Sequence, residues 1–467
     1  MNSKLKCLIA TTLLAVTTAL PIVAKAQTND RVLRIDGANR YETSINIAKQ
    51  FVGNDMIDSV ILASGKDYPD ALTGSILSKK YNAPIILVDY DTKNSEEQLQ
   101  FILSRLNPGG KIYLLGGKGA INNNFISYFK QNGFENVVRL GGKNRYETNE
   151  AIVKEAKVEE GTPIIIASSE SFADALSIST VSGENGYPIL LTPSNTLSES
   201  CKNQIETIKP TEIFIAGGTG AISSDVENEI ETLTPQLHKS KIVRLGGNNR
   251  YDTSFEILKY FKGKTAKDNI VIASGENFPD ALSASALAIK TNSPILLSNS
   301  QSINDKKAEL DSFKKVTIAG GKFTVDKFSE RLLNGENEFT FIAKQAYEEN
   351  GEKYIEGHFC KFSKDIKELE EYAKFYGTNS GVIQHPVYGP IVLDAGRDIR
   401  ISDDVKLKVK DNVEVKLVDW SSHDVLNDKI PSDFYTLTNR DSISGRFTFN
   451  LKINNGKVES IIQQYRQ

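Results

Sequence analysis

Short, wholly apolar runs alternate with longer amphipathic stretches through the first two-thirds of the chain. The first such runs are Val60–Ala63, Pro84–Val88 and Ile112–Leu115, and none of them alternates with charged positions. Strands of this type are typical of parallel sheets covered by helices on both faces. The stretches between them are long enough for crossover helices, so the pattern predicts a parallel, three-layer α/β fold.

The pattern occurs three times. Blocks of the form Arg-x-x-Gly-x-Asn-Arg-Tyr-acid-Thr stand 105 residues apart, at Arg34–Thr43, Arg139–Thr148 and Arg244–Thr253. Each copy is followed, in the same order, by an apolar Ala-Ser run, Asp-Ala-Leu, Pro-Ile-(Ile/Leu)-Leu and Gly-Gly. A fixed period of this kind indicates three homologous structural units.

Helix starts are marked by a cap-type residue with an acid three positions later. One set of pairs is Asn39 with Glu42, Asn144 with Glu147, and Asn249 with Asp252. A second set is Asp67 with Asp70, Ser171 with Asp174, and Asn277 with Asp280. Behind the first set, apolar residues recur at helical spacing and predict a buried helix face: Ile47, Ala48, Phe51; Ile152, Val153, Ala156; Ile257, Leu258, Phe261.

The third unit stops early, because no fourth Arg-Leu-Gly-Gly block follows Gly320-Gly321. The strand that carries Arg139 could close the first unit or open the second, and the sequence leaves both assignments open. We expect these segments: a signal peptide at 1–26, repeats at 27–136, 137–240 and 241–335, and a further module at 336–467.

The C-terminal segment has a different pattern. Residues 447–453 alternate between apolar and polar, and Asn454-Asn-Gly456 turns the chain into Lys457–Ile462, which predicts a β-hairpin. Val405–Val409 and Val413–Val418 are expected to form a second pair, and about Lys364–Tyr376 a helix. The sequence thus predicts a separate β-rich α+β module.

The N-terminus has the pattern of a secretory signal. Lys4 and Lys6 precede the uncharged, apolar run Leu8–Val23, and Ala24-Lys25-Ala26 fits a cleavage site. A membrane anchor is the alternative, although the run is short and interrupted by Thr and Pro. No second apolar run reaches the length of a membrane span, so none is expected after cleavage.

Net charge and cysteine content exclude some classes of function. The chain of 467 residues carries 56 basic and 59 acidic groups, and removal of residues 1–26 leaves 53 and 59, a net charge of −6. An acidic balance argues against nucleic acid as a partner. Three cysteines in so long a chain argue against a disulfide scaffold.

The repeated blocks resemble the cell wall binding repeat 2 family of Gram-positive surface proteins, in which three repeats accompany a variable domain. The resemblance implies three Rossmann-like units in a pseudo-threefold arrangement and non-covalent anchoring to an anionic wall polymer. In that family the Pro-Ile-Leu-Leu segment is associated with anchoring. This chain departs from the pattern at Ile35-Asp36-Gly37 and at Lys322–Val325.

The candidate ligand-binding residues are the repeated ones. An Arg fork at a helix start suits phosphate or carboxylate, Tyr can stack on a sugar, and Asp can accept from its hydroxyls. The alternatives are internal Arg–Asp pairs, core tyrosines, capping aspartates and simple Gly-Gly turns. The candidates are Arg40, Tyr41, Asp70, Pro84, Ile85, Ile86, Leu87 and Gly117; Arg145, Tyr146, Asp174, Pro188, Ile189, Leu190, Leu191 and Gly218; Arg250, Tyr251, Asp280, Pro294, Ile295, Leu296 and Leu297.

No cofactor or metal is expected. Gly117–Asn122 lacks the third glycine of a dinucleotide loop. We expect an anchor without catalytic activity that displays a module with a possible protein partner. The alternative is a wall-anchored hydrolase with a thiol or metal site. It would combine Cys360 with His358, His385 or His423 and with Asp394 or Asp419, but no surrounding motif supports it.

Overall fold

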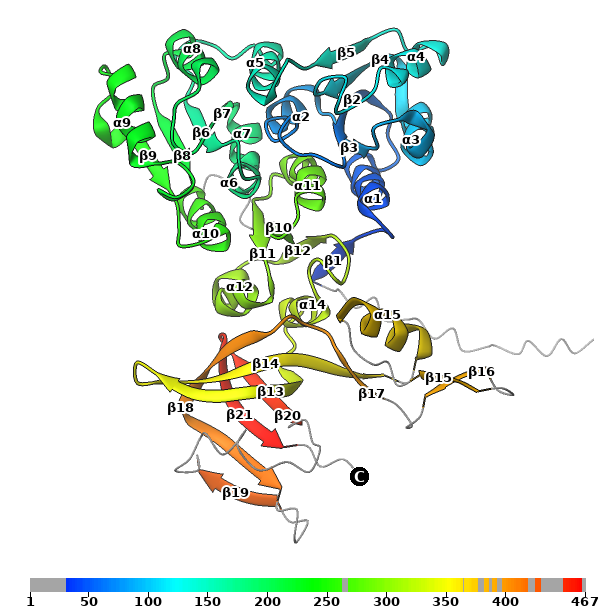
Figure 1. Cartoon of the computed structure of the whole chain (residues 1–467), viewed down its shortest axis with the longest axis vertical. Coiled ribbons are helices and arrows are strands. Elements are labelled where there is room, and N and C mark those ends of the chain that lie inside the picture. Colours follow the sequence, from blue (N-terminus) through cyan, green and yellow to red (C-terminus); the bar gives the residue numbers. More distant parts are fainter. Residues whose placement is uncertain are drawn as a thin grey trace, which may run out of the picture. The chain divides into compact units, whose positions relative to one another are not determined.

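The repeat region of the computed structural model contains three four-stranded parallel sheets flanked by helices (Figure 1). The structure describes residues 31–262, 268–363, 365–376, 382–385, 389–392, 397–418, 425–429 and 448–463. The expected signal peptide, and the alternative of an anchor there, lie outside these residues. Within the described ranges, no helix is both long and apolar enough to cross a bilayer.

The first sheet has the strand order β3-β2-β4-β5, and all its pairings are parallel. Its strands contain the three apolar runs, so the strand prediction is confirmed. Its elements are α1 (Arg40–Val52), β2 (Ile57–Ser64), α2 (Ser75–Tyr81), β3 (Ile85–Val88), η1 (Thr92–Asn94), α3 (Glu96–Arg105), β4 (Leu106–Leu115), α4 (Asn124–Gln131) and β5 (Val137–Leu140).

The second sheet repeats this order as β7-β6-β8-β9, again with parallel pairings. Its elements are α5 (Arg145–Ala156), β6 (Ile164–Ser168), α6 (Ala173–Ser177), α7 (Ser179–Asn185), β7 (Ile189–Thr192), α8 (Glu199–Ile208), β8 (Ile213–Ala216), α9 (Ser224–Leu233), η2 (Lys239–Lys241) and β9 (Ile242–Leu245).

The third sheet is completed by the first strand of the chain. Its order is β11-β10-β12-β1, in which β1 (Val32–Ile35) lies parallel to β12. Its other elements are α10 (Arg250–Phe261), β10 (Asn269–Ser274), α11 (Pro279–Lys290), β11 (Ile295–Ser298), α12 (Ser300–Asp305), α13 (Lys307–Leu310), β12 (Lys315–Ala319) and α14 (Lys327–Leu333).

This arrangement resolves the question of the Arg139 strand. β5 and β9 close the first and second sheets, although each leads directly into the next Arg-Tyr helix. No further repeat follows the third sheet to supply its fourth strand, and β1 occupies that position. The expected repeat boundaries at 136 and 240 stay predictions about units of sequence, and the sheets run across them.

Two arginines hold β1 in the third repeat. The Arg31 guanidinium donates to the carbonyls of Phe313 at 2.9 Å and Leu333 at 2.7 Å. Arg34 donates to the carbonyls of Gly320 and Val325 and forms an ion pair with Glu330 at 2.8 Å. These bonds satisfy backbone groups that would otherwise be buried without a partner.

The first set of predicted caps is confirmed. Asn39 accepts hydrogen bonds from the backbone N–H groups of Tyr41 and Glu42, and Asn144 and Asn249 do the same for α5 and α10. The Glu42 carboxylate accepts in turn from the Ala38 N–H at 2.8 Å.

The second set of predicted caps is wrong. α6 and α11 begin directly after Phe172 and Phe278, whose backbones are already helical and which make no side-chain cap bond. In the first repeat, the helix begins only at Ser75. Asp174 and Asp280 therefore stand at the second helical position and are not part of a cap.

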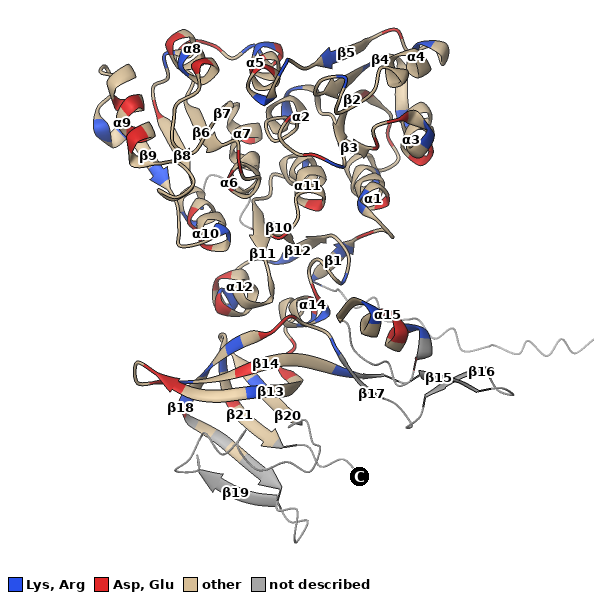
Figure 2. Cartoon of the chain, in the orientation of Figure 1, with Lys and Arg blue, Asp and Glu red and all other residues tan. Residues whose placement is uncertain are grey.

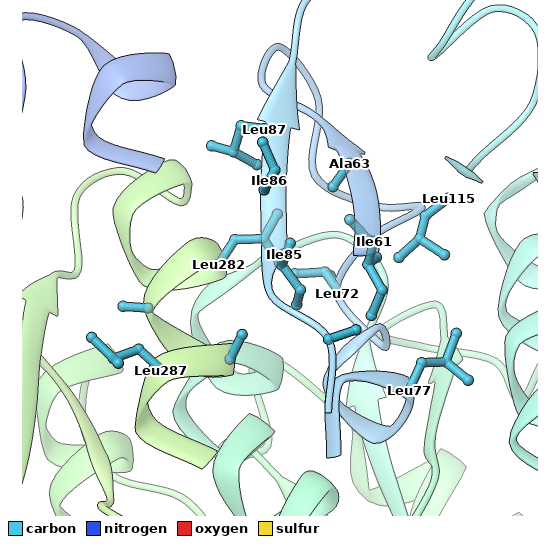
Figure 3. Packing of buried hydrophobic residues seen from close by; sticks show 14 of the residues in the cluster. Ile61, Ala63, Leu72, Leu77, Ile85, Ile86, Leu87, Leu115, Leu282 and Leu287 are labelled. Atoms are coloured by element: carbon cyan, nitrogen blue, oxygen red, sulfur yellow. The ribbon is translucent and has the colours of Figure 1, made fainter. Parts of the chain in front are cut away.

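The repeats pack on one another in a closed cycle. α2, α7 and α11 contact one another, and the helices that follow the Arg-Tyr blocks each contact a neighbouring repeat: α1 with α11, α5 with α2, and α10 with α6. One hydrophobic cluster runs through all three repeats. Figure 3 shows part of it, in which Leu282 of α11 lies beside Ile85 of β3.

The C-terminal module is β-rich, as predicted. Its strands are β13 (Glu338–Glu349), β14 (Glu352–Ser363), β15 (Val382–His385), β16 (Gly389–Val392), β17 (Arg397–Arg400), β18 (Val405–Val418), β19 (Val425–Lys429), β20 (Thr448–Asn454) and β21 (Lys457–Gln463), with α15 (Ile366–Tyr376). The β20–β21 hairpin and α15 confirm two expectations. The expected pair within 405–418 is wrong, because these residues form one strand, β18, with a register shift against β21.

Five of these strands form a closed ring. The order β14-β13-β20-β21-β18 returns to its start because β18 also pairs with β14. Closure of this kind leaves no free edge among the five strands.

The ring shares its core with the third repeat, although the sequence suggests a separate module. Phe328 of α14 stacks on Phe359 of β14 with ring centroids 3.7 Å apart. Gln301 of α12 exchanges two hydrogen bonds with the Lys406 backbone, at 3.0 and 2.8 Å. Apolar side chains of both parts belong to a single cluster.

Closure by β1 can be tested with Arg34→Ala. This change leaves the Gly320 and Val325 carbonyls without their donor and leaves Glu330 with Lys327 as its partner, so we expect a loss of about 2–4 kcal/mol in the free energy of unfolding. Urea unfolding measures the loss, and amide exchange should accelerate in β12 but not in β8. The control Lys130→Ala removes an exposed cation and should change stability by less than about 0.5 kcal/mol. Unchanged exchange in β12 would contradict the role given to β1.

Candidate functional site

Three equivalent arginines stand at the first position of α1, α5 and α10. Arg40 and Arg250 donate through Nη1 to the carbonyls of Gly65 and Gly275 at 2.6 Å, and Arg145 donates to the Ser169 carbonyl. These acceptors follow directly on β2, β6 and β10, the second strand of each sheet order. No carboxylate of the described residues forms an ion pair with any of the three arginines, so the alternative of internal Arg–Asp pairs is not observed.

Two of these arginines, Arg40 and Arg250, face a neighbouring repeat. The Arg40 guanidinium lies 5.9 Å from the ring centroid of Phe278 in the third repeat, and that of Arg250 lies 5.6 Å from Phe172 in the second. Their charges act on Asp280 and Asp174 of those same repeats. These two sites are therefore composite, with the cation supplied by one repeat and the carboxyl by another.

The three sites meet at a cluster of three aromatic rings. Tyr68, Phe172 and Phe278 occupy equivalent positions, two residues before each Asp-Ala-Leu, with centroids 5.6, 5.5 and 6.3 Å apart. Sequence reasoning missed this cluster, although an aromatic residue recurs at the same place in all three units. Aromatic faces of this kind bind the apolar faces of sugars and support a neighbouring cation.

We define the sites by these equivalent residues. The first site contains Tyr68, Asp70 and Arg145; the second contains Phe172, Asp174 and Arg250; the third contains Phe278, Asp280 and Arg40. The first assignment follows from the contact of α5 with α2, which matches those of α10 with α6 and of α1 with α11.

In the first two sheets the strand connections reverse at the two central strands. The chain leaves β2 towards β3 on one side and β4 towards β5 on the other, and β6 and β8 repeat this with β7 and β9. Ligands of open α/β sheets bind in the crevice at the carboxyl ends of such strands.

Two of the three repeated aspartates are buried. Asp174 and Asp280 are 8% and 9% exposed, whereas Asp70 is less buried. Burial raises the pKa of both Asp174 and Asp280 to about 6, and the neighbouring Arg250 and Arg40 oppose the shift. A Cβ on Gly217 would come within 2.6 Å of the Asp174 carboxylate, and one on Gly116 within 2.7 Å of the Asp70 carboxylate. The first glycine of each pair is thus required because the carboxylate occupies its side-chain space.

The Gly-Gly segments, which include Gly117 and Gly218, are tight turns. Gly116 and Gly217 have φ of 109° and 115°, a region that disfavours other residues. Arg139 donates to the Gly116 and Gly117 carbonyls, and Arg244 to that of Gly217. The first arginine of the Arg-x-x-Gly block therefore stabilises the Gly-Gly turn by hydrogen bonds to its carbonyl groups, which is a structural role.

The paired tyrosines are tied into their own repeats. Tyr41 donates to Asp89 at 3.1 Å, Tyr146 bonds with the Ser169 hydroxyl at 2.9 Å, and Tyr251 donates to Glu276. Burial and Asp89 together raise the pKa of Tyr41 to about 12. The hydroxyl groups of the three tyrosines thus have different partners. Equivalent residues that contact the same ligand would be expected to have equivalent surroundings.

The Pro-Ile-Leu-Leu segments lie in the core. Pro84–Leu87, Pro188–Leu191 and Pro294–Leu297 are buried throughout, and their aliphatic residues are at most 3% exposed. They form or precede the outer strands β3, β7 and β11, of which β3 packs against α11 and β11 against α6 of neighbouring repeats. Their side chains offer no surface to a polymer, and their place is in the packing between repeats.

The third site differs from the other two. Asp36 stands where the others have Gly141 and Gly246, and its charge acts on Asp280. Thr324 adds a hydroxyl that bonds to Asp280. The neighbouring departures Lys322 and Phe323 serve the C-terminal module, because Lys322 pairs with Glu371 of α15 at 2.7 Å and Phe323 stacks on Phe375 at 4.2 Å.

Charge is mixed over the outer helices. Figure 2 shows basic and acidic residues together on α3 and α8, whereas α9 carries acidic residues only. Exposed charges of this kind are screened beyond about 8 Å at physiological salt. Recognition of an anion must therefore come from short-range donors.

The candidate thiol of the C-terminal module is buried. Cys360 is 1% exposed, and Nδ1 of His358, two residues before it, lies 3.4 Å from the Asp404 carboxylate. Burial, with Arg400 adding to it, lowers the pKa of His358 to about 4. The side chain of His385, and all of Asp394, Asp419 and His423, lie outside the described residues. In the part of the chain that is described, no three His, Cys, Asp or Glu residues gather to hold a metal ion.

Three homologous parallel α/β units packed in a cycle place the chain among repeat-built proteins. A family model, the cell wall binding domain 2 (CWB2), matches residues 34–126, 139–227 and 244–329. These matches cover more than half of the chain, so it belongs to the CWB2 family. It is a protein of the cell wall or cell surface.

Characterised relatives support the same assignment. The chain is 25% identical over 287 residues to the N-acetylmuramoyl-L-alanine amidase LytC of Bacillus subtilis, covering 60% of this chain and 53% of that protein. It is 32% identical over 272 residues to the amidase enhancer of the same species, covering 58% and 35%. The chain therefore spans about half or less of the length of these relatives.

Solved structures share the fold. Cwp6 from Clostridium difficile matches with a TM-score of 0.59 and 26% identity, over 65% of this chain and 48% of that one. Cwp8 from the same organism matches with a TM-score of 0.57 and 24% identity, over 65% and 51%. The prediction of three Rossmann-like α/β repeats is confirmed.

The buried aspartates predict a pH dependence of stability. The folded chain holds these protons more tightly than the unfolded chain, whose carboxyls titrate near 3.8. The stabilisation is therefore complete below pH 3.8 and is lost as the pH rises through 6. Asp174→Asn should raise the free energy of unfolding at pH 7 by up to about 3 kcal/mol. Urea unfolding at pH 4 and pH 7 measures this, with the exposed Asp55→Asn as control. An equal response of the two variants at pH 7 would refute it.

Proposed function

We propose that this protein attaches non-covalently to an anionic cell-wall glycopolymer of teichoic-acid or secondary-polysaccharide type and displays its C-terminal ring of strands. The observation that carries the proposal is the set Arg40, Arg145 and Arg250. Each lies at a helix start between two repeats, and none forms an ion pair with a described carboxylate. Guanidinium N–H groups in this position suit phosphate or carboxylate.

Three linked sites compensate for weak single contacts. A polymer that engages one site brings its neighbouring units close to the next, so the later contacts form at a high effective concentration. The common aromatic cluster of Tyr68, Phe172 and Phe278 supports engagement of adjacent sites by one strand of polymer. This explains how an acidic protein holds an acidic polymer without long-range attraction.

The function proposed for the repeats is binding without catalysis. The alternative of a thiol hydrolase is not favoured, because the Cys360 side chain is buried and His358 is engaged with Asp404. A protein partner for the C-terminal module remains part of the proposal.

Single replacements of the three arginines test the proposal. With Arg40→Ala, Arg145→Ala or Arg250→Ala, retention of the full chain on washed walls should fall at least tenfold, because avidity is multiplicative. Retention is measured by sedimentation with purified walls, after circular dichroism has confirmed the fold. Lys130→Ala is the control of equal charge and should bind like the unchanged protein. A loss of one third for each variant would refute linked binding, and no loss would refute the site.

A further inference from the structure

The closed ring of five strands in the C-terminal module has a defined order. Numbered along the chain, β13, β14 and β18 are its first three strands, and β20 and β21 are the fourth and fifth. The pairings run first–second–third–fifth–fourth–first, and only the third and fifth strands are parallel. This is the order of the OB barrel, although α15 comes between the second and third strands.

OB barrels bind oligosaccharides or oligonucleotides on the face of their second and third strands. Because a shared fold does not fix a function, the side chains on that face decide what it can bind. Ile355 of β14 and Leu407 of β18 are buried in the core, and Tyr354, Lys406 and Lys408 alternate with them and are half-buried. Successive side chains of a strand point to opposite faces, so these three lie on the outer face.

Two tyrosines lie side by side on this face. Tyr347 of β13 is paired with Tyr354 in the strand register, and their ring centroids are 5.8 Å apart, with ring planes 29° apart. The Lys406 amino group lies 5.1 Å from the ring centroid of Tyr347 and 4.0 Å from that of Tyr354, which holds both rings in place. Rings that are already ordered lose little entropy when a ligand packs against them.

The polar groups around the two rings are paired with one another. The pairs are Lys406 with Glu349, Lys408 with Glu352 at 2.5 Å, and Gln345 with Glu356 at 2.8 Å. Both lysines are thus balanced by a carboxylate, unlike those of a positively charged groove that binds single-stranded nucleic acid. The pairs hold donors and acceptors in fixed positions, and the hydroxyl groups of a sugar can use both.

The turn beside the tyrosines is open. A Cβ on Gly351, between β13 and β14, would meet no atom of the described residues within 4 Å. The turn between β20 and β21 is covered by the third repeat, because Asn304 of α12 donates to the Gly456 carbonyl at 3.1 Å. The third repeat therefore covers one of these turns and leaves the turn beside the tyrosines open.

We propose that the outer face of β13, β14 and β18 binds an uncharged oligosaccharide, with a sugar ring packed against Tyr347 and Tyr354. The hydroxyl groups of the sugar bond to the polar pairs around these rings. This site is separate from those between the repeats, and it assigns a ligand to the module that the repeats display.

Titration calorimetry of the full chain with cellohexaose and chitohexaose tests the proposal. Tyr347→Ala and Tyr354→Ala should each weaken binding about tenfold, because a lost stacking contact is worth about that factor. Tyr354→Phe keeps the ring and should bind within about threefold of the unchanged protein. Tyr90→Ala, which removes a tyrosine of the first repeat that is 44% exposed, is the matched control and should leave binding unchanged.

Further measurements separate the possible ligands. Binding should change less than about twofold between about 50 and 300 mM salt, because an uncharged ligand releases no counterions. If Tyr354→Ala does not fold, Tyr354→Leu, which keeps an apolar side chain without the flat ring, should show the same loss. Equal binding by all variants, or no binding of either sugar, would overturn the proposal. If single-stranded oligodeoxythymidylate binds instead and both alanine variants lose it, the face binds nucleic acid and the oligosaccharide inference fails.

Discussion

The structure depends on one exchange: every sheet of the repeat region is finished by a strand that leads into the next unit. β5 and β9 perform this role for the first two sheets, and β1 closes the third. Because the helix that follows each such strand starts with an arginine, that arginine enters the crevice of a sheet other than its own. The composite sites, the cycle of helix contacts and the common core all follow from this connection.

Much of the fold could be predicted from local pattern. Uninterrupted apolar runs gave the strands, and Asn39 with Glu42 gave a helix start, because both signals act within a few residues. The position of β1 could not be predicted, since its pairing with β12 links distant segments that share no local signal. The predicted caps before Asp174 and Asp280 are wrong, because these helices begin directly after Phe172 and Phe278, whose rings pack against each other across two repeats.

The candidate site was predicted in part. The arginines and aspartates were found because they repeat, but their cross-repeat partnership depends on the exchanged strands. The Pro-Ile-Leu-Leu segments repeat for another reason, since every sheet needs an apolar outer strand against a neighbouring helix. A residue can therefore be repeated in a sequence because it packs in the core or because it binds a ligand. The burial of its side chain in the structure distinguishes the two cases.

The position of β1 also bears on the order in which the chain becomes ordered. Arg31 leaves the export machinery early, but the carbonyl of Phe313 to which it donates lies 282 residues further along the chain. Contacts of such long range form late, because the loop between them must be closed first. The cycle of repeats is thus completed only when nearly all of the wall-binding region has emerged, and until then the first strand must stay unpaired outside the cell.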